Sequence, residues 1–361
     1  MVAMETRVTK LLRLVGTLLL GERAMLRPGG PDRLARLFGL RAPRYVPHPY
    51  MLYALNRSWA SADGRTRHNA LGFRGAELAS EKASGSLRVV CMGESSTYCT
   101  GIADDRDAYP ARLHEALAAA LPGRTIEVVN AGVGGYTSAE NVLRCLFDVV
   151  PLEPDLVVYY YTHNDAHARR YPKLSRDYRE FSRSWFEPHG AGGVLAALRR
   201  RAILALGDIG ELVRRTEAHG GRRPSLNVAK NPPEAFAANM AALAAIARDA
   251  GARLLFVNPN YRDLDLNDAA DLAQPPSTNL AFRAVWEHRR IVENLAQRLG
   301  EGLVDLRGQI PYPETRDGFP TQDYLDPVHF TPAGAERAAK IVAQAILAQN
   351  LLGISAPEGG T

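Results

Sequence analysis

Apolar and polar positions follow two alternating patterns from residue 87 to the end of the chain. Short runs rich in Val, Leu, Ile and aromatic residues are bounded by Gly, Pro, Ser or Asp, which is typical of buried strands. The strands predicted in this way are Leu87–Met92, a segment around Val128, Leu156–Tyr161, Arg253–Asn258 and Gly302–Leu306.

Longer segments with apolar residues at helical spacing separate these runs. The predicted helices are Tyr109–Leu121, Ala139–Val149, Pro233–Ala250, Asn279–Leu299 and Ala333–Leu347. In Ala139–Val149, the residues expected on the apolar face are Leu143, Leu146 and Phe147. Strands that alternate with helices form a parallel sheet with right-handed crossovers. We therefore predict an α/β fold, a three-layer flavodoxin-like sandwich around a five-stranded parallel sheet.

Composition and charge limit the function classes. The 361 residues are 46% hydrophobic and 23% charged, as in ordinary globular proteins. The net charge of +5 is mild and no nucleic-acid-reading motif accompanies it, so we expect no nucleic-acid partner. Cys91, Cys99 and Cys145 lack metal-binding spacing and are predicted to be small core residues.

The first strand leads directly into candidate chemistry. Leu87–Met92 is followed by Gly93, Glu94 and Ser95, which places a serine hydroxyl at the carboxyl end of a strand. Open α/β sheets bind their ligands at this edge. Serine is also a preferred helix N-cap, so Ser95 or Ser96 as a simple cap is the alternative interpretation.

A second stretch supplies what a serine nucleophile needs. Asp326 and His329 stand three residues apart, and a serine requires a base that an acid orients. Thr331 and Pro332 follow as a helix cap and a first helical residue. His329 is therefore expected on a loop just before the last helix.

Two further strands end in polar or glycine-rich segments. One runs from Asn130 to Ser138 through a glycine-rich turn, and the other ends in His163, Asn164 and Asp165. With the serine stretch and Asp326–His329, these segments stand in the order of the four blocks of the SGNH-hydrolase family, also called GDSL esterases and lipases. The chain resembles this family from its first predicted strand to its last helix.

The resemblance implies a role for each matching residue. Ser95 matches the nucleophile, His329 the base and Asp326 the acid that orients it. The oxyanion hole implied by the resemblance consists of the backbone N–H groups of Ser95 and Gly135 and the side-chain amide of Asn164. No cofactor and no metal belong to this chemistry.

One residue departs from the family pattern, because Glu94 replaces the usual Asp before the nucleophile. That acid is not part of the triad, so we expect Glu94 to change local bracing rather than the reaction. The expected function is a serine hydrolase that cleaves an acyl ester linked to a carbohydrate or small molecule. An acyltransferase with the same acyl-enzyme and a non-catalytic binding protein of the same fold are the alternatives.

Residues 1–86 form a predicted N-terminal extension before the domain of residues 87–350. An apolar stripe within residues 7–26 is too short and too charged to span a membrane, and no cleavable signal follows it. It indicates either a helix packed on the protein or peripheral membrane contact, so the expected location is cytoplasmic or peripherally membrane-associated.

The segment His68–Gly75 is predicted to be an ordered loop. Gly72 and Gly75 are expected to form turns, and Phe73 to fill the core. The alternative is that Asn69 or Arg74 reaches the site.

A basic insertion, residues 166–230, begins directly after Asn164 and Asp165. It holds fourteen Lys and Arg residues against six Asp and Glu, a net charge of +8. It is either a solvated helical insertion or a cap whose arginines, Arg169, Arg170 and Arg176 among them, attract an anionic substrate. The nearby His163, Asp165 and His167 lack the further ligands of a metal site. Residues 351–361 are predicted to be a flexible tail.

Overall fold

The computed structural model describes residues 42, 44–57, 59–171, 174–184, 228, 230–260, 280–313 and 318–354. The apolar stripe of residues 7–26, most of the basic insertion and the tail from residue 355 lie outside the described residues, so the predictions made for them stay predictions.

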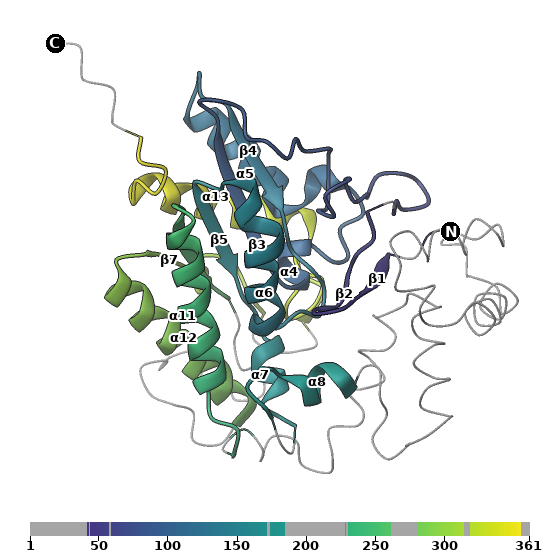
Figure 1. Ribbon diagram of the computed structural model, residues 1–361, viewed down its shortest axis with the longest axis vertical. Coiled ribbons are helices and arrows are strands. Elements are labelled where there is room, and N and C mark those ends of the chain that lie inside the picture. Colours follow the sequence, from purple (N-terminus) through teal and green to yellow (C-terminus); the bar gives the residue numbers. More distant parts are fainter. Residues whose placement is uncertain are drawn as a thin grey trace, which may run out of the picture.

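A five-stranded parallel sheet forms the centre of the molecule (Figure 1). Its strands are β3 (Leu87–Gly93), β4 (Ile126–Asn130), β5 (Leu156–Tyr160), β6 (Arg253–Asn258) and β7 (Gly302–Asp305). Their spatial order is β4-β3-β5-β6-β7, which is the flavodoxin-like order. The predicted fold class is confirmed. The four strands predicted with bounds end within one residue of their expected positions, and the segment around Val128 is β4.

Helices cover both faces of the sheet. α5 (Tyr109–Ala120) and α13 (Pro332–Ala348) pack on one face. α6 (Ser138–Arg144), α11 (Glu234–Asp249) and α12 (Leu280–Leu299) cover the other. Among the described residues, no helix combines the length and hydrophobicity needed to cross a membrane.

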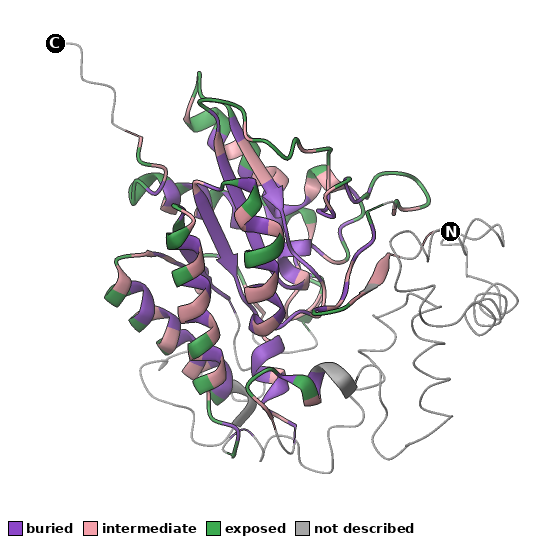
Figure 2. Ribbon diagram, viewed as in Figure 1, coloured by how far each residue is buried: buried purple, intermediate pink, exposed green. Residues whose placement is uncertain are grey.

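The sheet is buried on both sides (Figure 2). In β5, Leu156 and Val158 point into one hydrophobic cluster while Val157 and Tyr159 point into the other, because successive strand side chains alternate between faces. The three cysteines are buried free thiols, as predicted for small core residues.

The helix predicted for Ala139–Val149 differs from the observed element. α6 ends at Arg144 and continues as a π-helical segment, Cys145–Val149, in which the N–H of Val150 donates to the carbonyl of Cys145. The wider turn rotates the following side chains, and a 3-10 turn, Val150–Leu152, then ends the element. Leu146 and Phe147 are therefore 47% exposed, so their assignment to the apolar face was wrong.

The sequence did not predict an antiparallel hairpin in the N-terminal extension. β1 (Tyr45–His48) and β2 (Leu52–Leu55) pair with each other, apart from the central sheet (Figure 1). Four-residue strands around Pro47 and Pro49 carry too little alternation to be recognised. In a third hydrophobic cluster, Met51 and Tyr53 of this hairpin pack with buried aromatic residues of the insertion: Tyr171, Tyr178 and Phe181.

The described start of the insertion is part of the core. It contains α7 (Asn164–Ala168) and α8 (Arg179–Ser184). Arg169 is 2% exposed and its guanidinium lies 2.6 Å from a carboxylate oxygen of Glu287 on α12. Arg169 therefore fits neither interpretation of the insertion, as a solvated side chain or as an arginine that attracts an anionic substrate, because it is buried and paired. Arg176 is exposed, as expected.

Candidate active site

A sharp turn carries Ser95 to the carboxyl edge of the sheet. β3 ends at Gly93, where φ is +151° and a Cβ would lie 2.1 Å from the carbonyl oxygen of Tyr160. Only glycine fits this position. Ser95 then begins the four-residue helix α4 (Ser95–Tyr98), whose N-cap is Glu94 without a side-chain cap bond. Neither Ser95 nor Ser96 is the cap, and Ser95 is partly exposed while its neighbours are buried.

Ser95, His329 and Asp326 form one chain of hydrogen-bonding groups. Nε2 of His329 lies 2.8 Å from Oγ of Ser95, and Nδ1 lies 2.8 Å from a carboxylate oxygen of Asp326. An ionised carboxylate only accepts hydrogen bonds, so Nδ1 of a neutral ring carries the proton and Nε2 is free to accept from the serine hydroxyl. The sequence-predicted triad residues therefore meet.

The charge state of Asp326 fits this arrangement. Partial burial of the carboxyl group tends to raise its pKa. Hydrogen bonding and charge interaction with the His329 ring, together with the backbone N–H groups of Val328 and His329, outweigh burial and lower the pKa to about 2. Asp326 is thus ionised at neutral pH and able to stabilise an imidazolium.

The loop that carries His329 is fixed at both ends. Thr331 caps α13 by accepting from the backbone N–H of Gly334, and Pro332 is the first helical residue, both as predicted. On the other side, the hydroxyl of Ser96 donates to the carbonyl of Val328 at 3.1 Å. The residue after the nucleophile therefore ties the nucleophile helix to the histidine loop.

The glycine-rich turn after β4 lies against the nucleophile helix. At Gly132, a Cβ would lie 2.2 Å from the backbone nitrogen of Tyr98, so the two backbones meet where no side chain fits. At Gly134, a Cβ would lie 3.8 Å from Cβ of Ser95. Gly135 follows in the same turn, so the structure brings this predicted oxyanion-hole residue to the edge that carries Ser95.

Asn164 reaches the same turn from the next strand. It is the first residue of α7 and is 9% exposed. Its side-chain amide donates to the carbonyl of Tyr136 at 2.8 Å. An Asn amide has two N–H donors, so a second remains for another acceptor.

Two buried carboxylates connect these segments. Glu94 accepts from the backbone N–H of Thr162 at 3.1 Å, from its hydroxyl at 2.5 Å and from the N–H of Asn164 at 3.3 Å. Asp165 accepts from the N–H and hydroxyl of Ser138 at 2.9 and 2.5 Å. Glu94 therefore braces the nucleophile turn against the end of β5, and Asp165 braces α7 against the start of α6.

Burial sets the protonation behaviour of both carboxylates. Desolvation, with the nearby charge of Asp165 adding to it, raises the pKa of Glu94 to about 8 against its hydrogen bonds. Burial likewise raises the pKa of Asp165 to about 6, and the Ser138 hydrogen bonds oppose this change. These two groups hold protons at higher pH than ordinary carboxyls.

His163 and His167 lie beside the site without forming a metal centre. Their ring centroids are 5.8 Å apart. Burial, followed by repulsion from His167 and His329, lowers the pKa of His163 to about 3, so its ring is neutral. Within the described ranges, no group of three or more His, Cys, Asp or Glu side chains is arranged to hold a metal ion.

Sequence reasoning missed Tyr45, which lies at the site. A Cβ at Gly134 would lie 3.0 Å from the Tyr45 hydroxyl, and Tyr53 of the same hairpin donates to the Gly134 carbonyl at 2.8 Å. The only available signal was the pair of aromatic residues on either side of a Pro-containing turn. Arg74 and Asn69 were the other residues considered for the site, and their side chains bind backbone carbonyls instead, that of Arg74 at Tyr98 and that of Asn69 at Ala76.

Comparisons with known proteins place the chain in a family. The sequence model of the GDSL-like Lipase/Acylhydrolase family matches residues 91–337, more than half of the chain. No curated protein matches this chain in sequence.

Among solved structures, LAE5, an alpha/beta hydrolase enzyme from the metagenome of Lake Arreo, is 20% identical. The match covers 75% of this chain and 98% of LAE5, with a TM-score of 0.43. A variant of Axe2, an acetyl xylan esterase from Geobacillus stearothermophilus, is 18% identical over 73% of this chain and 95% of its own, with a TM-score of 0.44. A GDSL-like lipase from Bacteroides thetaiotaomicron is 17% identical over 75% and 92%, with a TM-score of 0.41. On the family match, which runs from the first strand across Asp326 and His329, the chain belongs to the GDSL-like lipase and acylhydrolase family, and this membership supports an acyl ester hydrolase.

Proposed function

We propose that the protein is a serine esterase that works through an acyl-enzyme on Ser95. The observation that carries this proposal is the continuous chain Ser95–His329–Asp326, in which both contacts measure 2.8 Å. A base within this reach of a hydroxyl can take its proton as the hydroxyl attacks.

The reaction runs in two halves. Oγ of Ser95 bonds to the acyl carbon while His329 takes the hydroxyl proton, and the carbonyl electron pair moves to the oxygen. When the tetrahedral intermediate collapses, the bond to the leaving alcohol breaks and His329 returns the proton to that oxygen. Water then attacks the acyl carbon while His329 takes its proton. When this second intermediate collapses, the bond to Oγ of Ser95 breaks, His329 returns the proton to Oγ, and the carboxylic acid leaves. The charge of Asp326 stabilises the imidazolium in both halves.

We assign the oxyanion hole to the N–H groups of Ser95 and Gly135 and the amide of Asn164. Ser95 supports this role because the first N–H groups of a helix lack partners within the helix. Asn164 supports it because its amide group already lies against the glycine turn. Donors fixed before the reaction stabilise the developing charge without reorganisation.

The proposed substrate is an acyl group esterified to a carbohydrate or another small molecule. Every group that the proposed chemistry uses belongs to the chain, so it requires neither metal nor cofactor. If the acyl-enzyme instead passes its acyl group to an alcohol or amine, the same residues perform an acyl transfer. Product analysis with an added alcohol separates the two, because transfer yields a new ester and hydrolysis yields only the acid.

A fluorophosphonate probe tests the nucleophile. The wild-type protein is expected to be labelled at Ser95 and to hydrolyse a short-chain p-nitrophenyl ester, and Ser95→Ala should abolish both. Ser96→Ala tests the neighbouring hydroxyl and should still be labelled at Ser95, at a lower rate, because it removes the tie to Val328 and none of the reacting atoms. Labelling that persists in Ser95→Ala and disappears in Ser96→Ala contradicts the assignment. A folded wild-type protein that neither reacts with the probe nor hydrolyses esters supports the binding-protein alternative.

A further inference from the structure

The helix that carries Ser95 is too short to hold its own position. α4 contains four residues, and it ends at Cys99, which has φ 62° and ψ 55° in the left-handed region. The last four carbonyl groups of any helix lack partners within the helix. Because α4 has four residues, this applies to all of its carbonyl groups. Groups outside α4 must therefore satisfy them and fix the helix.

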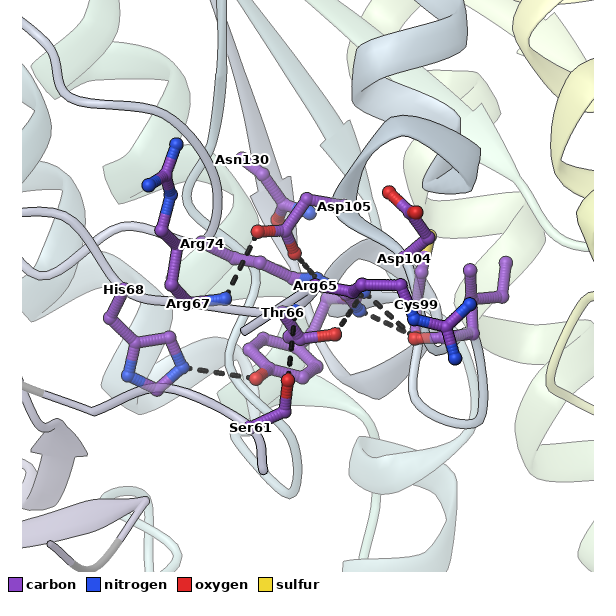
Figure 3. Close-up of polar contacts among 12 residues, drawn as sticks. Ser61, Arg65, Thr66, Arg67, His68, Arg74, Cys99, Asp104, Asp105 and Asn130 are labelled. Carbon is purple, nitrogen blue, oxygen red and sulfur yellow. Dashed lines mark hydrogen bonds and ion pairs between the residues drawn. The ribbon is translucent and has the colours of Figure 1, made fainter. Parts of the chain in front are cut away.

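Arg74 binds the last carbonyl group of α4 and two carbonyl groups of the turn that follows it (Figure 3). Nη1 donates to the carbonyl oxygens of Tyr98 at 2.6 Å and Cys99 at 2.8 Å, and Nη2 donates to that of Ile102 at 2.8 Å. The third nitrogen, Nε, lies 2.7 Å from a carboxylate oxygen of Asp105. The Arg74 side chain is 1% exposed and that of Asp105 is 16% exposed, so the guanidinium itself is shielded from water.

The backbone of Arg74 is itself held in place. Its N–H donates to the carbonyl of Asn130 at the end of β4, and the preceding Phe73 is 1% exposed in the core. Asp105 is also fixed, because its other carboxylate oxygen accepts from the backbone N–H of Arg67 at 3.0 Å (Figure 3). The guanidinium thus joins the sheet edge to the end of the nucleophile helix.

On the basis of the proposed esterase function, we propose that Arg74 is a positioning residue that sets where Ser95 stands relative to His329. The two members of the pair belong to different segments: α4 ends on Arg74, while His329 belongs to the loop before α13, which the Ser96 hydroxyl ties to α4. A shift of α4 therefore changes the contact between Ser95 and His329 directly. A misplacement of about 1 Å at a reacting group can cost about 100-fold in rate.

Lysine cannot replace the guanidinium in this position. A planar guanidinium presents five donors in fixed directions, whereas an ammonium is a single point with three donors. Arg74→Lys keeps the charge opposite Asp105 but loses the simultaneous contact with the carbonyls of Tyr98, Cys99 and Ile102. It is therefore the variant that separates geometry from charge.

Arg88 offers a matched control at the other end of β3. It is 0% exposed, donates to the carbonyl of Leu152 at 2.7 Å and to that of Ala79 at 3.1 Å, and pairs with Glu127 at 2.7 Å. Its environment thus resembles that of Arg74, but its carbonyl partners do not belong to the nucleophile helix. Loss of its contacts affects folding without moving Ser95.

The test compares Arg74→Lys and Arg88→Lys in the full chain. For each variant we would measure the melting temperature, kcat and KM for a short-chain ester, and the rate of fluorophosphonate labelling at Ser95. Both variants are expected to melt at lower temperature. Arg74→Lys should lower kcat and the labelling rate by about 10- to 100-fold while KM stays within about threefold. Arg88→Lys should keep both rates. Millimolar guanidinium should partly restore labelling in Arg74→Ala and should have no effect on Arg88→Ala.

Asp105→Asn is the second variant, should Arg74→Lys not fold. It removes the negative charge that pairs with Nε of Arg74. It should therefore lower kcat less than Arg74→Lys does, again without a change in KM. Folded Arg74→Lys or Asp105→Asn protein with wild-type kcat and labelling rate overturns the positioning role, as does an equal loss of kcat in Arg88→Lys. Wild-type protein that is unreactive at Ser95 overturns the esterase proposal first, and the positioning role with it.

Discussion

Oγ of Ser95 and Nε2 of His329 lie 2.8 Å apart, although 234 positions separate the two residues in the chain. Ser95 reaches this contact from the end of β3 and His329 from the loop before α13, so the four crossovers from β3 to β7 lie between them in the chain. The distance lies within the range in which a base can take a proton from a hydroxyl. The contact therefore makes the pair the first target for substitution.

His329→Ala is expected to lower kcat by about 10⁴-fold or more, because no other group then takes the serine proton. Asp326→Asn should cost between about 10² and 10⁴-fold, since the imidazolium loses its counter-charge and the ring its orientation. Both are measured with a short-chain ester. His163→Ala is the control and should keep kcat within about tenfold. Full activity of His329→Ala together with an inactive His163→Ala identifies His163 as the base instead.

Glu94 predicts a fall in stability as the pH rises. Its pKa is about 8 in the folded protein against an ordinary 4.5, so the folded state keeps a proton that the unfolded state has released. The contribution of Glu94 to the free energy of unfolding therefore decreases as the pH rises between these two values and is level above about pH 8.

The clearest window for this effect lies between about pH 6.5 and about pH 8. Asp165, with a pKa of about 6, is ionised in both states over most of this window. Burial lowers the pKa values of His68, His163, His167 and His288 from 6.5, so they still raise stability as the pH rises near the lower end of the window. The effect of Glu94 is therefore measured as a difference: in urea unfolding from about pH 6.5 to about pH 8, the wild-type protein should lose about 1 to 2 kcal/mol relative to Glu94→Gln. The same pH dependence in both proteins would contradict the raised pKa of Glu94.

Arg169→Gln should destabilise the protein, in contrast to substitutions of exposed arginines in the same insertion. Its guanidinium donates to the carbonyl of Asn231 at 2.6 Å and pairs with Glu287, which in the variant would keep Arg283 as its partner. The variant leaves the buried Asn231 carbonyl without this donor, and an unsatisfied buried acceptor costs about 1 to 3 kcal/mol. Arg176→Gln, at an exposed position, should change the free energy of unfolding by less than about 0.5 kcal/mol. Thermal or urea unfolding measures both variants. Equal stability of Arg169→Gln and Arg176→Gln would contradict a stabilising role for the buried contacts of Arg169.

Gly132→Ala should displace the nucleophile helix. The new methyl group would lie 2.2 Å from the backbone nitrogen of Tyr98 and 2.6 Å from the backbone carbon of Thr97, and neither backbone atom can move without moving α4. We expect a strong loss of kcat together with a lower melting temperature. Gly123→Ala is the control, since a methyl group there meets nothing within 4 Å and only the positive φ is strained, at about 1 kcal/mol. Wild-type kcat in Gly132→Ala would show that the two backbones can separate without harm.

Much of the fold could be predicted from local pattern. Buried strands such as Leu156–Tyr160 are continuous apolar runs because helices cover both of their faces, and their alternation with helices determines a parallel sheet. The start of α13 at Thr331 and Pro332 could also be predicted, since helix capping depends only on residues that are neighbours in the sequence. The four motifs at strand ends likewise pointed to one edge of the sheet, because parallel strands all end there.

Features that depend on contacts between distant segments of the chain could be seen only in the tertiary structure. The π-helical segment that exposes Leu146, the hairpin that brings Tyr45 to the site and the burial of Arg169 have no local signal, since each is set by what packs against it. Arg74 shows the same limit: its sequence position suggested a loop residue or a site residue, whereas its guanidinium binds the end of the nucleophile helix. The sequence by itself determined which strands form and which residues stand at their ends. The tertiary structure decided which of those residues meet, because the free energy of a contact depends on partners that the chain brings together only by folding.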